Sequence, residues 1–447
     1  MGHFSRSARS LVSGSLSWDR IRQIGFSVAD QGFSVGGMFL VNIGLARTQT
    51  KEEYGVFALT YSVFTFLAGL HNATILEAYT IHGSGRYHAH FPAYSRLLWR
   101  KNIGFALGLT AVLLLLWRAL AWAVPAFRSR TILGMALVCG VLLTASFARR
   151  TFYIRRRPDL AARFSAIFLA VCLALLWLSI GTGTLSGFAA FLSVGMSWSI
   201  AALFVAKELR GGTDSRDFSE IEPGYWAEHW KYSRWVLVTA LVFQFTTQGY
   251  YWLAAGILSV KEVGDLRALY NVVTPIDQLF VAMVLLILPM MSFRYSSRRM
   301  AGLVPLWRRY CIACLVITCG FAAFINLFGK QIMHVLYAGR FDDIAPLVGI
   351  LALLPVVMGI GNTINAALKA MEKPQAVFYA YVASGAATFL IGLPLIVYFG
   401  LRGAVYGMLA SAAVYTAALG IGFIICAYQA DVRFVDFAAA GKQDRLA

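Results

Sequence analysis

Long apolar runs alternate with short polar breaks along almost the whole chain. Each run is close to the roughly 20 residues that an α-helix needs to cross the hydrocarbon core of a bilayer. The pattern predicts about twelve membrane-spanning helices, so both termini are expected on the same side of the membrane. The expected spans are residues 24–45, 55–80, 102–124, 131–150, 162–182, 187–206, 232–258, 268–291, 309–328, 344–369, 376–398 and 403–427.

Composition supports the membrane interpretation. Hydrophobic residues make up 59% and charged residues 13% of the chain, and the mean hydropathy is +0.67. Soluble domains hold roughly half apolar and a quarter charged residues. A soluble fold could not bury so much apolar surface, and the spans leave no stretch for a sizeable soluble domain. The expected class is therefore an all-α, multi-pass membrane protein.

The formal net charge of +18 could indicate a nucleic-acid-binding protein, so the placement of the basic residues has to decide. With the N-terminus in the cytoplasm, 29 of the 39 Lys and Arg residues fall in cytoplasmic segments. Such a bias is typical of membrane topology. The sequence thus predicts cytoplasmic termini, a bacterial inner membrane as the location and no nucleic-acid partner.

The longest hydrophilic stretch divides the chain into two halves with six expected spans each. It is expected to be a cytoplasmic linker at the membrane surface. The predicted organisation is a cytoplasmic N-terminal segment at 1–23, a six-helix bundle at 24–206, the linker at 207–231, a second six-helix bundle at 232–427 and a cytoplasmic tail at 428–447.

Two local matches suggest that the halves repeat one another. Residues 51–55 and 261–264 both place a charged break before a glycine, and Gly55 and Gly264 are 209 residues apart. Arg-Pro at 157–158 and Lys-Pro at 373–374 are 216 residues apart, which is close to the same offset. Since each half has an even number of spans, the pattern predicts two bundles related by a pseudo-two-fold axis along the membrane normal.

Motifs of soluble enzymes are missing from the sequence. It contains no P-loop, no G-x-G-x-x-G before a helix, no H-E-x-x-H and no G-x-S-x-G. The six cysteines lie in the expected spans or at their ends, which predicts neither a disulfide framework nor a metal site. We therefore expect no enzymatic activity and no cofactor.

Acidic residues inside the spans are candidates for binding a coupling ion, because a charge at bilayer depth is costly unless it faces protein or water. Asp277 follows Pro275 near the middle of its span and is the strongest candidate for a proton or sodium site. Asp30 is either such a site or the buried partner of an amide or arginine. Glu77 is either such a site or a side chain that reaches the membrane interface.

Amide and basic residues inside the spans are candidates for lining a substrate cavity. Gln244 and Gln248 lie one turn apart, so they either bind sugar hydroxyls or hold helices together. Asn362, Asn365 and Lys369 are spaced to form one polar face in the inner half of the tenth span. That face suits an anionic head group, although Lys369 would also fit as a simple cytoplasmic flank.

Several segments resemble one transporter family. In the first half these are Asp30-Gln31 within an apolar span, residues 46–47 and residues 52–58 (EEYGVFA). In the second half they are residues 336–341, residues 365–374 and residues 401–407 (LRGAVYG). Together they resemble the Wzx-type flippases, the polysaccharide transporters of the multidrug/oligosaccharidyl-lipid/polysaccharide (MOP) exporter superfamily.

The resemblance implies a V-shaped pair of six-helix bundles, MATE/MOP-like, that flips an undecaprenyl-pyrophosphate-linked oligosaccharide to the outer leaflet by alternating access. The glycan would be a repeat unit of O-antigen, capsule or exopolysaccharide, and H+ or Na+ would be the coupling ion. Membrane lipids and other polysaccharide-assembly membrane proteins are the expected partners. The implied cationic cavity would draw on Arg47, Arg118, Arg267 and Lys369. Asn72, in the inner half of the second span, is a further candidate for lining the substrate cavity.

Two other classes compete with this hypothesis. A multidrug exporter of the same superfamily would bind organic cations through carboxylates and aromatic rings, and the intramembrane acids are compatible with it. A membrane glycan polymerase or glycosyltransferase would resemble its relatives in having a large outward loop, whereas the longest outward loop expected here, about residues 329–343, is short.

Overall fold

The computed structural model describes residues 18–123, 129–206, 208 and 224–443. Every regular element in this part of the chain is a helix, which confirms the all-α prediction. Most of the predicted linker at 207–231, and the first and last residues of the chain, lie outside the described residues.

The first half of the chain is built from helices. Its helices are α2 (Trp18–Thr48), α3 (Lys51–His71), the π-helical turn η1 (Asn72–Leu76), α4 (Glu77–Ser84), α5 (Phe91–Ala123), α6 (Arg130–Ile154), α7 (Pro158–Gly181) and α8 (Gly187–Phe204). Polar residues cap their starts: the Thr50 hydroxyl accepts from the Glu53 N–H at the start of α3, and the Ser186 hydroxyl accepts from the Ala189 N–H at the start of α8.

The second half contains two unusually long helices, each with one break. Its helices are α10 (Tyr225–Ile257), α11 (Val260–Tyr337), α12 (Pro346–Leu351), α13 (Leu354–Ala370), α14 (Pro374–Ala387), the π-helical turn η3 (Thr388–Gly392) and α15 (Leu393–Gln443). Arg299 interrupts α11 and Gly400 interrupts α15 with non-helical backbone angles. At these points the chain changes direction between two helical arms.

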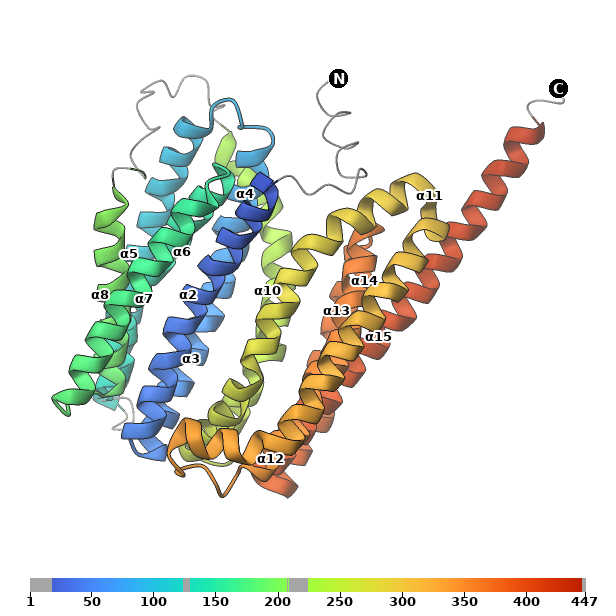
Figure 1. Cartoon of the computed structure of the whole chain (residues 1–447). Coiled ribbons are helices and arrows are strands. Elements are labelled where there is room, and N and C mark those ends of the chain that lie inside the picture. Colours follow the sequence, from blue (N-terminus) through green and yellow to red (C-terminus); the bar gives the residue numbers. More distant parts are fainter. Residues whose placement is uncertain (1–17, 124–128, 207, 209–223, 444–447) are drawn as a thin grey trace.

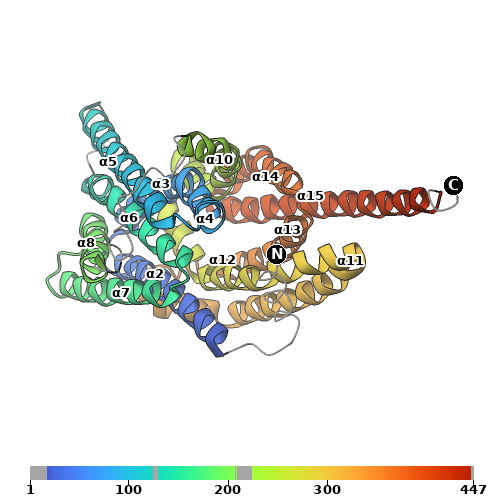
Figure 2. The same cartoon turned by 90° about the horizontal axis from the view of Figure 1, so that it is seen from above.

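Eight described helices are long and apolar enough to cross a membrane. The expected spans in α2, in α10 and in the first arm of α11 are not among them. The helices of the first half, blue to green, gather on one side of the molecule, and α11 to α15, yellow to red, gather on the other (Figures 1 and 2). A multi-pass helical fold is thus confirmed, while twelve spans with cytoplasmic termini stay a prediction.

The turns that enter α7 and α14 have the same backbone geometry, which supports the predicted repeat. Arg156 and Glu372, 216 residues apart, both adopt a left-handed conformation, with φ of 56° and 58°. The next residue of each turn donates its N–H back to the preceding helix, from Arg157 to the Phe152 carbonyl and from Lys373 to the Leu368 carbonyl. Proline follows as the first residue of each helix, where its missing N–H costs nothing.

We expect Gly400→Ala to destabilise the protein, because Gly400 has φ 59° and ψ −134°, a region that residues with a β-carbon rarely occupy. The cost should be about 1–3 kcal/mol, seen as a lower thermal unfolding midpoint in detergent. Gly420→Ala is the matched control, since Gly420 lies in α15 with open space around it. Equal midpoints for the two variants would contradict this account of the break.

Candidate functional site

A polar cavity of about 250 Å³ lies within the first half of the chain. We call it the arginine cavity. Helices α2, α3 and α6 and the turn η1 supply its walls, and it is lined by Gln31, Ala68, His71, Asn72, Leu76, Ser146, Arg149, Arg150 and Tyr153. Two guanidinium groups therefore lie next to each other at the end of α6, facing amide and imidazole side chains.

Asp30 holds one of these arginines in place. Its fully buried carboxylate accepts from Nε and Nη2 of Arg149 at 3.1 and 2.7 Å, a bidentate ion pair. The hydroxyls of Tyr153 and Ser165 also donate to it, at 2.6 and 2.5 Å. Both carboxylate oxygens are thus occupied by protein partners from α6 and α7. These contacts favour the structural alternative for Asp30 over an ion-coupling role.

Arg150 is bound more loosely. One of its terminal nitrogens donates to the side-chain oxygen of Asn72 at 3.1 Å, and no carboxylate in the described part of the chain forms an ion pair with it. The Nε2 of His71 is bonded to Asn102, which fixes the imidazole at the cavity wall. Asp30 pairs with Arg149, whereas the Glu77 carboxylate acts on Arg150 only from beyond ion-pair distance. The Arg150 guanidinium is therefore the group of this cavity that suits an anionic ligand.

The π-helical turn η1 ties this region to α10. In a π-helix each backbone bond spans five residues, so the local pairing of carbonyls differs from that of an α-helix. The Thr74 carbonyl accepts from Nε2 of His229 and from the hydroxyl of Ser233, both at 2.9 Å. Burial lowers the pKa of His229 to about 4, so the ring is neutral near pH 7 and donates through Nε2.

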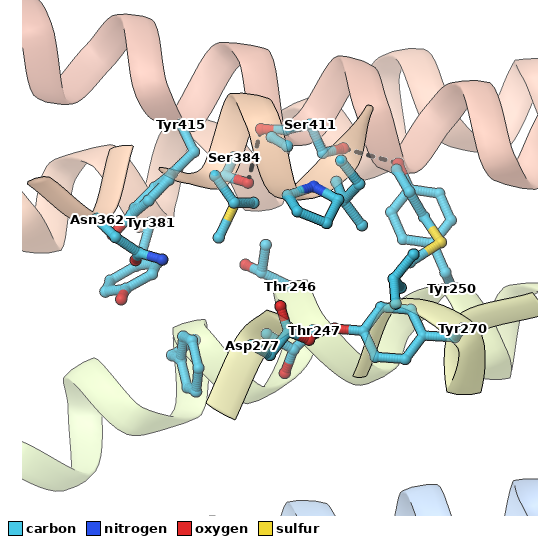
Figure 3. A pocket seen from close by; sticks show the side chains of 17 residues that line it. Thr246, Thr247, Tyr250, Tyr270, Asp277, Asn362, Tyr381, Ser384, Ser411 and Tyr415 are labelled. Atoms are coloured by element: carbon cyan, nitrogen blue, oxygen red, sulfur yellow. Dashed lines mark hydrogen bonds between the residues drawn. The ribbon is translucent and has the colours of Figure 1, made fainter. Parts of the chain in front are cut away.

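A second cavity, of about 130 Å³, lies within the second half between α10, α11, α13, α14 and α15. We call it the tyrosine cavity. Figure 3 shows Asp277 and Tyr270 side by side at its edge, with Thr246 and Thr247 close to them. The rest of its polar lining is Asn362, Ser384, Ser411 and the hydroxyls of Tyr250, Tyr381 and Tyr415.

Asp277 gives the tyrosine cavity a negative group. Its carboxylate accepts from the Tyr270 hydroxyl at 3.0 Å, and no basic side chain of the described residues forms an ion pair with it. Ser411 is instead bonded within the protein, to the Tyr250 hydroxyl at 2.7 Å and, through its carbonyl, to the Ser384 hydroxyl (Figure 3). An uncompensated carboxylate among hydroxyls and aromatic rings suits a small cation or a proton.

The other predicted residues lie apart from these two cavities. Gln244 is buried against α3, where its amide donates to the Thr65 carbonyl and sits over Gly69. Arg267 donates to Asn42 of α2 at 3.2 Å, and Arg47 donates to carbonyls at the end of α11.

The remaining candidates are dispersed. Glu77 accepts from the Tyr232 hydroxyl at 3.1 Å, and the buried Asn365 donates to the Tyr415 hydroxyl. Gln248 is half-buried and Lys369 is exposed. The structure therefore gathers Asn72 into the arginine cavity and joins Asn362 with Asp277 in the tyrosine cavity.

Sequence reasoning missed Arg149 and Arg150 as cavity residues. They end a predicted span and are followed by three further arginines, so they look like an ordinary cytoplasmic flank. One local feature of the sequence could have indicated their role. The arginine pair precedes the rest of the cluster by more than one helical turn, which places it at the same depth in the membrane as Asp30.

Neither a family model nor a curated protein matches the sequence. Solved structures do match the fold. An inward-facing multidrug resistance MATE family transporter of the MOP superfamily is 13% identical with a TM-score of 0.73, covering 91% of this chain and 98% of its own. The outward-facing conformation of a multidrug resistance MATE family transporter is 12% identical in sequence, with a TM-score of 0.67. The match covers 92% of this chain and 96% of that one.

A MOP superfamily transporter from Pyrococcus furiosus, described as having a binding pocket of reverse polarity, is 12% identical with a TM-score of 0.66, covering 92% and 95%. The fold is therefore that of MATE transporters of the MOP superfamily.

We expect Asp30→Asn to destabilise the protein strongly, because it leaves Arg149 without its buried counter-charge. Breaking such a pair costs about 3–5 kcal/mol. Asp159→Asn is the matched control: it removes the exposed Arg157–Asp159 pair, which is worth at most about 1 kcal/mol. Thermal unfolding of both variants measures the difference, and similar midpoints would show that Asp30 does not anchor the helices.

Proposed function

We propose that this protein is a bacterial inner-membrane transporter that flips a lipid-linked oligosaccharide, carried on undecaprenyl pyrophosphate, from the cytoplasmic to the outer leaflet. The observation that carries the proposal is the arginine cavity. It offers Arg150, which forms no direct ion pair with a carboxylate among the described residues, beside Arg149, Asn72 and His71. Guanidinium groups bind phosphate oxygens through several parallel hydrogen bonds, which suits a diphosphate.

The substrate chemistry explains why a protein of this fold is needed. A diphosphate and its sugars would lose their water in the hydrocarbon core, at a cost that prevents unaided crossing. A polar site between helices removes most of that cost while the lipid tail stays in the bilayer. The inside-negative membrane potential adds about 2.3 kcal/mol per charge per 100 mV in favour of moving an anion outward.

The tyrosine cavity provides the coupling site within the same proposal. Asp277 would bind H+ or Na+ beside Tyr270 and release it on the other side of the membrane. Because the two cavities lie in different halves of the chain, the anionic substrate and the cation would not compete for the same groups. Coupling would then operate through the relative movement of the halves.

A second candidate function is export of organic cations. The four tyrosines and the carboxylate of the tyrosine cavity favour it, since aromatic faces and an acid together bind ammonium groups. In that case the tyrosine cavity would hold the substrate and the arginine cavity would be structural. The two functions differ in which cavity is essential.

Deletion cells complemented with variants test the flippase directly. We expect deletion to accumulate lipid-linked oligosaccharide on the cytoplasmic leaflet, and Arg150→Gln to restore less than about a tenth of wild-type flipping, because a bidentate contact worth more than 1.4 kcal/mol is lost. Arg163→Gln, which alters an exposed arginine of the same half, should complement fully. Unchanged lipid intermediates after deletion would exclude flipping.

A pair of measurements on Asp277→Asn separates the two functions. If Asp277 couples an ion, the variant should lose the dependence of flipping on the ion gradient while still binding the lipid-linked oligosaccharide. If Asp277 binds an organic cation, the variant should instead lose resistance to cationic dyes, with lipid intermediates unaffected. Ion-dependent flipping at the wild-type level would remove Asp277 from the mechanism.

A further inference from the structure

The start of α3 and the start of α11 meet in a reciprocal contact. A β-carbon at Gly55 would overlap the Val260 carbonyl oxygen, and one at Gly264 would lie 2.7 Å from the Lys51 carbonyl oxygen. With the offset of 209 residues, Gly264 is the counterpart of Gly55 and Val260 is the counterpart of Lys51. Each half thus presents the same two positions to the other, as in a two-fold symmetric interface. We call these four residues the glycine seam.

Charged residues surround the glycine seam and join the same two halves. The Lys51 ammonium lies 3.3 Å from the Asp265 carboxylate and 2.8 Å from that of Asp343. Burial raises the pKa of Asp265 above its ordinary value, although Lys51 opposes this shift. These ion pairs link α3 to the start of α11 and to the turn that follows its end.

Two arginines add further contacts between the halves beside the glycine seam. Arg47, at the end of α2, donates through Nε to the Leu336 carbonyl at 2.6 Å and through Nη2 to the Val335 carbonyl. These carbonyls belong to the last turn of α11, which has no helical partners for them. Arg340 donates in return to the Arg47 carbonyl at 2.8 Å. Cations at a helix C-terminus are also favoured by the helix dipole.

The helices converge at this end of the molecule and separate towards the other. In Figure 1 the ribbons of α2, α3 and α11 lie close together near α12, whereas the second arm of α11 and α15 lead away from α2 at the end where α2 begins and α15 ends. The buried Tyr54 packs directly behind the seam, accepting from Asn271 of α11 at 2.9 Å. The contacts between halves near the seam are therefore tight and polar.

We propose that the glycine seam, with the Lys51 and Arg47 contacts around it, is the closed gate at the outer end of the transport path, and that it parts in every cycle. This inference rests on the flippase function proposed above, in which the two halves move relative to each other. The two glycines allow helix starts from different halves to touch backbone to backbone, and the ion pairs exchange partners for water when the gate opens. The glycines set how fully the gate shuts, and the charges set how long it stays shut.

Distances between spin labels at positions 52 and 261 test the gate. Both residues are exposed, flank the seam and are counterparts under the same offset. Labels on genetically encoded unnatural amino acids leave the six native cysteines in place. We expect Gly55→Ala and Gly264→Ala to shift the main distance peak to longer values, because the added methyl group keeps the helix starts apart. Gly256→Ala, in open space nearby, is the matched control and should leave the peak unchanged.

Lys51→Ala keeps the test decisive if a glycine variant does not fold. It removes the ion pairs without adding volume and should enlarge the population at long distance. The gate would be overturned if Lys51→Ala and every glycine variant that folds gave the same label distances as Gly256→Ala. The distance measurement needs no substrate. If the variants change the label distance as expected but the wild-type protein does not flip lipid-linked oligosaccharide, the proposed substrate is refuted and the gate is not.

Discussion

The free-energy cost of burying the Asp30 carboxylate determines how helices pack in the first half of this protein. An ion moved from water into a protein interior loses several kcal/mol of solvation unless partners replace the water. Asp30 meets this demand with a bidentate arginine and two hydroxyls, and those partners come from α6 and α7. One carboxylate on α2 thereby fixes three helices relative to one another and sets the direction of Arg149. The arginine cavity depends on that arrangement.

The two cavities have opposite polarity and lie in different halves of the chain. The first has guanidinium groups and amides, and the second has a carboxylate and tyrosines. The two halves therefore differ in the side-chain chemistry of their cavities. The equal turns at Arg156 and Glu372 show how closely the backbone geometry agrees at matched points.

The helical class and the boundaries of many helices could be predicted because they follow from local hydrophobic runs and from proline and capping residues. The pairing of Asn362 with Asp277 in one cavity could not, since those residues lie on different helices. The partners of Asp30 are 119 to 135 residues away in sequence, beyond any helical spacing. Arg149 and Arg150 could not be recognised as cavity residues because they precede a cluster of further arginines. Only the tertiary fold distinguishes an arginine that lines a cavity from one at the cytoplasmic flank of a helix.

The π-helical turn at Asn72–Leu76 links these themes. A turn of this kind carries one more residue than an α-helical turn, so the side chains before and after it point in directions that a regular helix could not combine. Asn72 accepts a hydrogen bond from Arg150, and two residues later the Thr74 carbonyl accepts from His229 and Ser233 of α10. The arginine cavity is thus one short backbone segment away from α10, the first described helix of the second half. The segment therefore links the wall of the arginine cavity to the position of α10.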